Sequence, residues 1–184
     1  MKTLGFVNQK GGVGKSFVSK IVANALSGSQ HKKRVLLIDC DDEQTISADL
    51  RQRDFRYSNE FRYDVAICSP TDLPAVIAGR KPLHVVTKSG FENLEFDEKN
   101  YDYTIIDMPG RGQDKGISGL LACLDFAIIV VKGDDSESLS TLKFLKKITE
   151  TKELRQKHEI RGLHHIGIYI IHLRHILRHS SKRH

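Results

Sequence analysis

Cysteine is scarce in this 184-residue sequence, which contains only Cys40, Cys68 and Cys123. The three are odd in number and far apart, so they lack the close pairing that a zinc site or an iron–sulfur cluster requires. We therefore expect reduced thiols, as in a cytoplasmic protein.

Long apolar segments are also missing. No apolar run approaches the roughly 18 residues that span a bilayer, and Met1-Lys2 leads directly into residues 3–7 without a signal-peptide core or cleavage site. The sequence is 39% hydrophobic and 28% charged, which is typical of a soluble globular protein. Since there is no internal repeat and no low-complexity linker, we expect one compact domain over residues 1–184.

Acidic residues are nearly absent from residues 155–184. This segment has seven lysines and arginines and a single acid, Glu159, and so carries the entire formal net charge of +6. Seven of the nine histidines lie there as well. Such asymmetry favours an anionic partner, either nucleic acid or a membrane surface. The alternative is a solvated basic tail without a partner.

Short apolar runs alternate with longer amphipathic ones along the chain. This alternation predicts an α/β protein with a mostly parallel sheet between two layers of helices, a three-layer α/β/α fold. The apolar runs are too short for helices and are expected to be buried on both faces of the sheet. We expect strands at residues 3–8, 34–39, 63–68, 84–87, 103–107 and 126–131, and helices at residues 16–26, 69–79 and 136–153.

The most informative stretch is Gln9-Lys10-Gly11-Gly12-Val13-Gly14-Lys15-Ser16, between an expected strand and an expected helix. In that context glycines let successive backbone N–H groups turn toward phosphate oxygens, and the helix adds its positive end. Lys15 would neutralise the β- and γ-phosphates, and the Ser16 hydroxyl would bind Mg²⁺. The expected nucleotide-binding residues are Gly11, Gly12, Val13, Gly14, Lys15, Ser16 and Phe17.

One detail departs from the ordinary phosphate loop, because Gln9 stands where glycine is usual and Lys10 adds a second lysine. The stretch resembles the deviant Walker A motif of the ParA/MinD family of ATPases. The resemblance implies a P-loop NTPase fold of the SIMIBI type, ATP and Mg²⁺ as cofactors, and a homodimer that closes around the nucleotide. It also implies that Lys10 reaches the partner subunit's phosphates, as an arginine finger does.

A pair of acids, Asp39 and Asp41, follows the second expected strand. By resemblance to the first switch of that family, Asp39 would lie near the Mg²⁺ shell and Asp41 would orient the attacking water. The sequence departs from the common pattern, since Asp42-Glu43 replaces the single residue that usually precedes Gln44. The alternative for Asp39 is a cap on the next helix.

The strand expected at residues 103–107 ends in another acid, Asp107, followed by Met108-Pro109-Gly110. An apolar strand running into aspartate is a Walker B arrangement, in which Asp107 would hold a water on Mg²⁺. The Asp-x-Pro-Gly sequence resembles the family's second switch, a loop that moves when the γ-phosphate is lost. The expected metal ligands, partly through water, are Ser16, Asp39 and Asp107, and the expected catalytic residues are Lys10, Lys15 and Asp41.

The C-terminal end matches the family less well. In that family a further strand ends in an asparagine that recognises adenine. Residues 165–172 of this sequence could be the corresponding strand, but no asparagine follows them. The sequence ends 12 residues after His172, where relatives continue with more helices, so we expect a shortened C-terminus over residues 155–184. Because the first strand begins almost at Met1, we also expect the short type of partition ATPase, without an N-terminal helix-turn-helix.

A helix is the alternative for the same C-terminal segment. A basic amphipathic helix can lie on a membrane, as in MinD-like relatives, although Ile168 and Ile171 would then fall on its polar face. The apolar residues at helical spacing are Ile166, Tyr169, Ile170, Leu173, Ile176 and Leu177.

The same end has two further candidate roles. His172, His175 and His179 have a spacing that could suit a metal, but no cysteine or carboxylate accompanies them. Phosphate contacts on DNA fit the charge asymmetry best. The candidate DNA-binding residues are Arg174, Arg178, Lys182 and Arg183.

Taken with the resemblance, these observations predict a ParA-type partition ATPase from a plasmid or another mobile element. It would dimerise on binding ATP, bind DNA without sequence preference on the nucleoid, and hydrolyse ATP slowly until a ParB-like, centromere-bound adaptor stimulates it. The alternatives are a MinD-like ATPase that works on a membrane surface and a relic that binds nucleotide without turnover.

Overall fold

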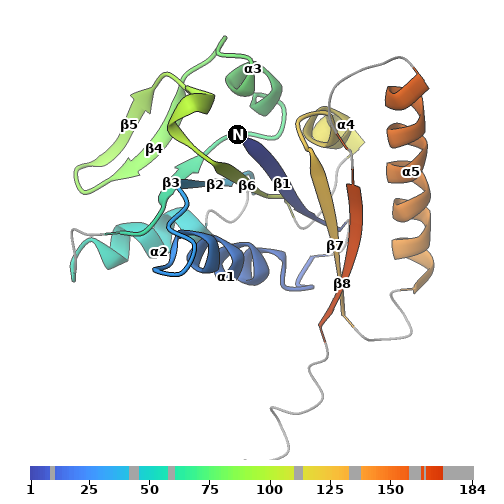
Figure 1. Ribbon diagram of the computed structural model, residues 1–184, viewed down its shortest axis with the longest axis horizontal. Coiled ribbons are helices and arrows are strands. Elements are labelled where there is room, and N and C mark those ends of the chain that lie inside the picture. The colour runs from blue at the N-terminus through green and yellow to red at the C-terminus, as the bar shows by residue number, and fades with distance from the viewer. Residues whose placement is uncertain are drawn as a thin grey trace, which may run out of the picture.

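The computed structural model describes residues 1–8, 11–41, 46–57, 61–109, 114–132, 138–157, 163 and 165–171, and its centre is a single β-sheet (Figure 1). In the described part of the chain the sheet has eight strands in the order β5-β4-β3-β2-β6-β1-β7-β8. The strands are β1 (Lys2–Val7), β2 (Val35–Asp39), β3 (Asp64–Ile67), β4 (Leu83–Thr87), β5 (Gly90–Leu94), β6 (Tyr103–Asp107), β7 (Phe126–Lys132) and β8 (His165–Ile171).

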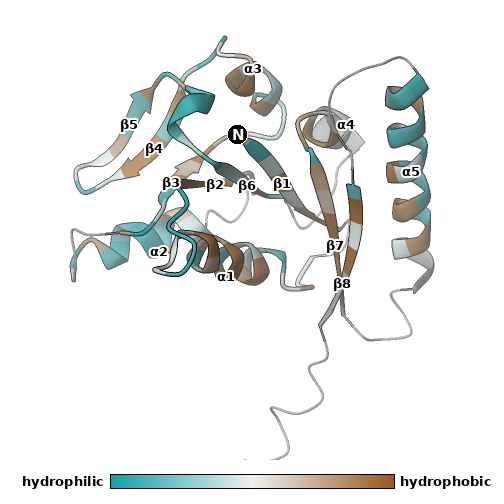
Figure 2. Ribbon diagram, in the orientation of Figure 1, coloured by the Kyte–Doolittle hydropathy of each residue, from teal (hydrophilic) through white to brown (hydrophobic). Residues whose placement is uncertain are grey.

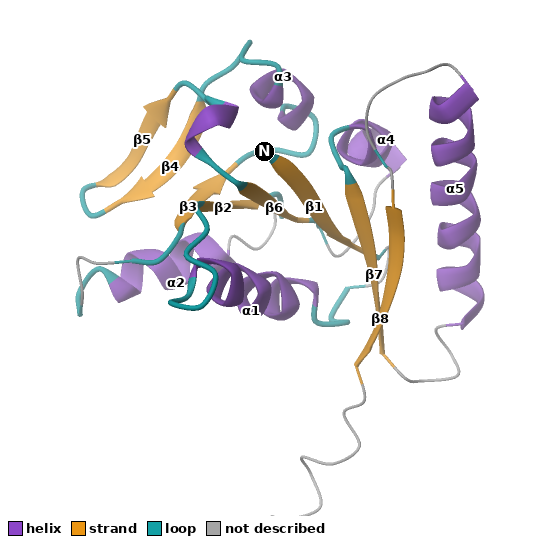
Figure 3. Cartoon of the chain, in the orientation of Figure 1, coloured by secondary structure: helices purple, strands orange, loops and turns teal. Residues whose placement is uncertain are grey.

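Helices cover both faces of the sheet (Figures 1 and 3). Helices α1 (Lys15–Ser27) and α2 (Ile46–Asp54) lie on one face. The other face carries α3 (Leu73–Ile77), α4 (Asp114–Ala122) and α5 (Ser138–Lys157), while the short 3₁₀ helix η1 (Glu98–Asn100) precedes β6. The three-layer α/β/α fold expected from the sequence is therefore confirmed.

The alternation of side chains along each strand divides the core into two clusters. In β2 all five residues are buried, and neighbouring side chains point to opposite faces of the sheet. Leu36 and Ile38 pack under α3, α4 and α5, whereas Leu37 packs under α1 and α2. In Figure 2 the central strand β2 is mainly apolar, whereas α1 and α5 mix apolar and polar residues along their length.

Most strand pairs are parallel, and the parallel strands end at a common edge. β1 pairs with β6 and β7, β2 pairs with β3 and β6, and β7 pairs with β8. The register aligns Asp107 with Phe6 on one side and with Asp39 on the other. This alignment brings the loop after β1 next to the two acidic strand ends.

One edge of the sheet is antiparallel, because β3 pairs with β4 and β4 pairs with β5 in a hairpin. β5 was not expected from its sequence, and neither were α2 and α4. The sequences of α2 and β5 are weakly patterned and mostly polar or exposed, so that their neighbours in the fold determine them, whereas the amphipathic pattern of α4 was overlooked.

The opposite edge settles the strand-or-helix question at residues 165–171. This segment is β8, parallel to β7 over seven register pairs from Phe126↔His165 to Lys132↔Ile171. The helical interpretation is therefore wrong for residues 166–171, because pairing with the β7 edge satisfies their backbone groups. The rest of that interpretation lies outside the described residues, as do His172, His175 and His179 and the candidate DNA-binding residues Arg174, Arg178, Lys182 and Arg183. Within the described ranges, no helix is both long and apolar enough to cross a bilayer.

Candidate functional site

The loop after β1 turns sharply into α1. Gly12 and Gly14 have φ angles of 73° and 96°, in the left-handed region that glycine adopts without strain. Gly14 is the N-cap of this 13-residue helix and makes no side-chain cap hydrogen bond, because glycine has no side chain. Such a helix start favours a bound anion through its N–H groups and its dipole.

Lys15 is the first residue of α1 and is only 5% exposed. Burial lowers the pKa of its ammonium group, while the charges of Asp107 and Asp41 raise it. The structure therefore places the loop lysine between the helix start and two of the expected site carboxylates.

Asp107 is 1% exposed, and neither of its carboxylate oxygens makes a well-formed hydrogen bond to a described residue. Burial raises its pKa to about 7, and the Asp39 charge adds to that rise. The Ser16 side chain lies close enough to lower the same pKa, as do the charges of Lys15 and Lys20. A buried carboxylate without well-formed hydrogen bonds is costly, so among the described residues this oxygen pair is the one most in need of a further partner such as a cation.

Asp39 is also buried, but its carboxylate has backbone partners. Oδ2 accepts a hydrogen bond from the Ser47 N–H at 2.9 Å, and Oδ1 accepts one from the Asp41 N–H at 3.2 Å. Burial raises the pKa of Asp39, and these backbone hydrogen bonds oppose the rise. Because Ser47 lies in the first turn of α2, Asp39 makes the helix-capping contact that was the alternative for this residue.

Asn8 was not singled out from the sequence, yet it supports the start of the loop. Its side chain is buried, and Nδ2 donates to the Val130 carbonyl at 2.8 Å. This bond ties the end of β1 to β7. The sequence did show an amide side chain directly before the glycine loop. Its hydrogen-bond acceptor could not be foreseen, because Val130 lies 122 positions away in the sequence.

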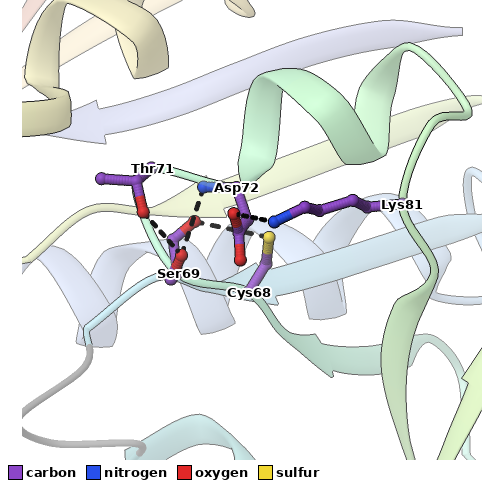
Figure 4. Close-up of polar contacts among 5 residues, drawn as sticks. All are labelled: Cys68, Ser69, Thr71, Asp72 and Lys81. Carbon is purple, nitrogen blue, oxygen red and sulfur yellow. Dashed lines mark hydrogen bonds and ion pairs between the residues drawn. The ribbon is translucent and has the colours of Figure 1, made fainter.

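A cavity of about 490 Å³ opens beside Asp39 and Asp41, at the ends of β2 and β3. Figure 4 shows the polar residues along its rim, which the sequence did not indicate. Lys81 Nζ lies 2.6 Å from Asp72 Oδ1, and the Ser69 hydroxyl accepts from the Asp72 N–H at 3.2 Å. The Lys81 hydrogen bond is the main cause that lowers the pKa of Asp72.

The sequence matches the family described as the CobQ/CobB/MinD/ParA nucleotide binding domain over residues 4–175. The chain belongs to this family. A comparison with curated protein sequences gives no significant match.

Solved structures with the same fold include other proteins of this nucleotide-binding class. A plasmid partition protein from Borrelia burgdorferi is 19% identical, with 98% of this chain and 83% of that chain covered and a TM-score of 0.57. Cobyrinic acid a,c-diamide synthase from Mycobacterium smegmatis, solved with ADP and magnesium, is also 19% identical, with 92% and 74% covered and a TM-score of 0.57. MinD from Aquifex aeolicus is 23% identical, with 92% and 69% covered and a TM-score of 0.54. Identities this low show a shared fold.

Membership of the CobQ/CobB/MinD/ParA nucleotide-binding-domain family implies a phosphate ligand with Mg²⁺, and the described residues fit that ion. Within the described ranges no three His, Cys, Asp or Glu side chains form a metal cluster. Mg²⁺ does not require one, since it keeps several waters and combines one or two carboxylates with phosphate oxygens. The buried Asp107 oxygens, which make no well-formed hydrogen bond to a described residue, and the nearby Ser16 hydroxyl match this need.

The sequence-predicted site residues fall into three groups. The structure brings Lys15, Ser16 and Asp107 together with Asp39 and Asp41 at one edge of the sheet. Phe17 is 64% exposed on α1, and its expected role in nucleotide binding remains a prediction. Lys10, residues 42–45 and residues 110–113 lie outside the described ranges.

Proposed function

We propose that this protein is an ATP-driven switch of the partition type. It binds ATP with Mg²⁺ at residues 11–16, closes a homodimer around the nucleotide, binds DNA in that state, and is reset when ATP is hydrolysed to ADP and phosphate. The observation that carries the proposal is the buried Asp107 carboxylate, which has no well-formed hydrogen bond among the described residues and lies near buried Lys15 and the Ser16 side chain.

Each described residue has a specific task in this proposal. The N–H groups at the start of α1 bind phosphate oxygens, and the Lys15 ammonium neutralises their charge. The Ser16 hydroxyl and Asp107 hold the metal site, where a bound Mg²⁺ supplies positive charge to the phosphate oxygens. Asp39 fixes the loop that carries Asp41, because it accepts the Asp41 N–H.

Asp41 is the candidate that orients the attacking water. It is half-buried, lines the cavity beside the site, and its charge raises the pKa of Lys15. A carboxylate in this position can accept a hydrogen bond from water and aim its oxygen at phosphorus. Lys10 completes the proposal by acting across the dimer on the partner subunit's nucleotide.

The choice of DNA as the switched partner rests on charge. Residues 155–184 carry the whole net charge of the sequence, and a cationic segment that neutralises phosphates binds nucleic acid with little sequence preference. The Borrelia burgdorferi neighbour is named a plasmid partition protein, which supports this choice. A ParB-like adaptor and a place on the nucleoid follow as further parts of the proposal.

The deciding experiment measures binding to random-sequence duplex DNA with ATP, with ADP and without nucleotide, over a range of salt concentrations. The proposal expects tight binding only with ATP, weakening steeply as salt rises because bound phosphates release counterions. Equal or absent binding in all three states would remove DNA as the switched partner. ATP-dependent sedimentation with anionic liposomes, in place of DNA binding, would instead indicate a MinD-like role on a membrane.

A second experiment tests the two-lysine arrangement. Lys10→Ala should bind ATP but lose most of its hydrolysis, since a cation that acts on the transferring phosphoryl group contributes mainly to the transition state. The matched control is Lys88→Ala, in the exposed turn between β4 and β5. Normal hydrolysis by Lys10→Ala would show that the second lysine has no catalytic task.

A further inference from the structure

Two of the three cysteines, 28 positions apart in the sequence, stand side by side at the ends of neighbouring strands. The β2–β3 register pairs Ile38 with Ala66 and Asp39 with Ile67. The next pair in this register is Cys40 with Cys68. The last hydrogen bond of this ladder, from the Cys68 N–H to the Asp39 carbonyl at 3.1 Å, holds the two chains side by side at this point.

The two thiols also share a face of the sheet. Both side chains belong to the core cluster under α3, α4 and α5, in which Ile38 and Ala66 also lie. Paired residues on neighbouring strands have Cα atoms about 4.8 Å apart, which is within the span that a disulfide bridges. The third cysteine, Cys123, lies after α4, and its Sγ donates to the Gly119 carbonyl at 3.3 Å.

One residue of the pair borders a cavity. Cys40 is fully buried, whereas Cys68 is 7% exposed and lines the cavity next to Asp39 and Asp41. A small oxidant that enters this cavity therefore meets the wall to which Cys68 belongs. A thiol at a cavity wall beside a second thiol can act as a redox-sensitive cysteine with its resolving partner.

We propose that Cys40 and Cys68 form a reversible disulfide when the protein meets a peroxide, and that this bond restrains the site loop. The Cys68 sulfur attacks one peroxide oxygen, the O–O bond breaks, and hydroxide leaves with the thiol proton as water, which produces a sulfenic acid. The Cys40 sulfur then attacks the Cys68 sulfur, the S–O bond breaks, and the departing oxygen takes up the Cys40 proton and leaves as water. Two thiols are oxidised by two electrons, and one hydrogen peroxide is reduced to two waters.

The consequence follows from the position of Cys40 between Asp39 and Asp41. The Asp41 N–H donates to the Asp39 carboxylate, so the backbone of residues 39–41 is linked by a hydrogen bond across Cys40. A covalent bond from Cys40 to the end of β3 restrains that segment without touching the phosphate loop after β1. Oxidation should therefore slow turnover more than it weakens nucleotide binding. The bond itself does not depend on the proposed function, whereas its effect on turnover does.

The test treats the full chain with hydrogen peroxide, blocks the remaining thiols by alkylation, and maps peptides by mass spectrometry without reduction. The expected result is one linked pair, Cys40 with Cys68, in the monomer, which disappears with dithiothreitol. Cys68→Ser and Cys40→Ser should each abolish the link, and Cys123→Ser should retain it. Absence of the linked peptide in the wild-type chain would overturn the proposal, and this measurement needs no variant to fold.

Turnover is measured on the same samples. We expect oxidation to slow ATP hydrolysis about tenfold, with nucleotide affinity changed less than about threefold, and dithiothreitol to restore the rate. Inhibition by peroxide that persists in Cys68→Ser would contradict the proposed control. If the link forms but the reduced protein hydrolyses no ATP, the disulfide proposal stands and the proposed function fails.

Discussion

The Asp39 carboxylate accepts a hydrogen bond from the Ser47 N–H at 2.9 Å, although eight positions separate the two residues. This bond connects the end of β2 to the first turn of α2, across residues 42–45. A residue expected near the metal is therefore also the residue that anchors the following helix.

The first prediction concerns this anchor. Asp39→Ala should reduce the free energy of unfolding by about 1–2 kcal/mol, because the Ser47 and Asp41 N–H groups lose their acceptor. Asp39→Asn keeps an acceptor and removes a charge whose burial is unfavourable, so its stability should lie within about 0.5 kcal/mol of the wild type at pH 8. Urea denaturation measures both. An Asp39→Ala variant as stable as the wild type would show that the contact contributes nothing.

Asp107 gives a pH-dependent prediction for the nucleotide-free protein in a chelator. Its pKa is about 7 in the folded protein and ordinarily 3.8, so the folded state keeps a proton that the unfolded chain releases. The free energy of unfolding therefore falls as pH rises from about 4 to 7, and the loss remains above pH 7.

Asp107→Asn removes that titration. The difference in the free energy of unfolding, variant minus wild type, should increase by about 2–3 kcal/mol from pH 5 to pH 8. The increase corresponds to the roughly two pH units between pH 5 and the folded-state pKa of Asp107. Thermal or urea unfolding at several pH values follows the difference, with the exposed Asp49→Asn as control. Wild-type and Asp107→Asn curves that stay parallel over this range would refute the buried-carboxylate explanation.

Substitution of Lys15 should weaken ATP binding without lowering the stability of the folded protein. We expect Lys15→Ala to lower the affinity for ATP about tenfold to a hundredfold, since a charge-assisted contact to phosphate is lost. The stability of the nucleotide-free protein should not fall, because burial already disfavours this ammonium group. Fluorescence titration with a labelled ATP analogue and urea denaturation measure the two effects, with the exposed Lys143→Ala as control. Unchanged affinity would mean that the loop is not a phosphate loop.

The last prediction concerns the C-terminal half of α2. The Arg51 guanidinium lies 4.2 Å from the Phe61 ring centroid and 4.7 Å from that of Tyr63, and Nη1 donates to the Tyr63 carbonyl at 2.6 Å. Arg51→Ala should reduce the free energy of unfolding by about 2–3 kcal/mol. Arg53→Ala, whose exposed side chain lies 3.7 Å from Asp54, should change it by less than about 0.5 kcal/mol. Equal effects of the two variants would exclude the ring contacts as the cause.

The sequence predicted best those elements whose pattern is local. β6 begins and ends at the expected residues, since a continuous apolar run into Asp107 marks a buried parallel strand. The phosphate loop is recognisable for the same reason, because its glycines and Lys15 carry the chemistry within eight neighbouring positions.

The elements that were missed depend on distant partners. α2 has a mostly polar sequence, and the acceptor that caps it, Asp39, comes from the preceding strand. β5 is largely exposed and is held by its pairing with β4. For residues 165–171 the apolar spacing suits both a strand and a helix, and only the free edge of β7 decides between them.

The same distinction applies to the site. Asp39, Asp41 and Asp107 were found because each follows an apolar strand. The ion pair of Lys81 with Asp72 depends on how the chain returns after α3. The proximity of Cys40 to Cys68 arises from the register of β2 with β3, and a register cannot be derived from a single strand's sequence.

The central place of β1 has a consequence for synthesis on the ribosome. β1 is made first, yet its neighbours β6 and β7 begin at Tyr103 and Phe126, so more than half of the chain must emerge before it acquires a partner. Non-local parallel pairing of this kind is slow and leaves apolar surface exposed meanwhile. The nascent chain should therefore depend on chaperones until β7 has left the exit tunnel.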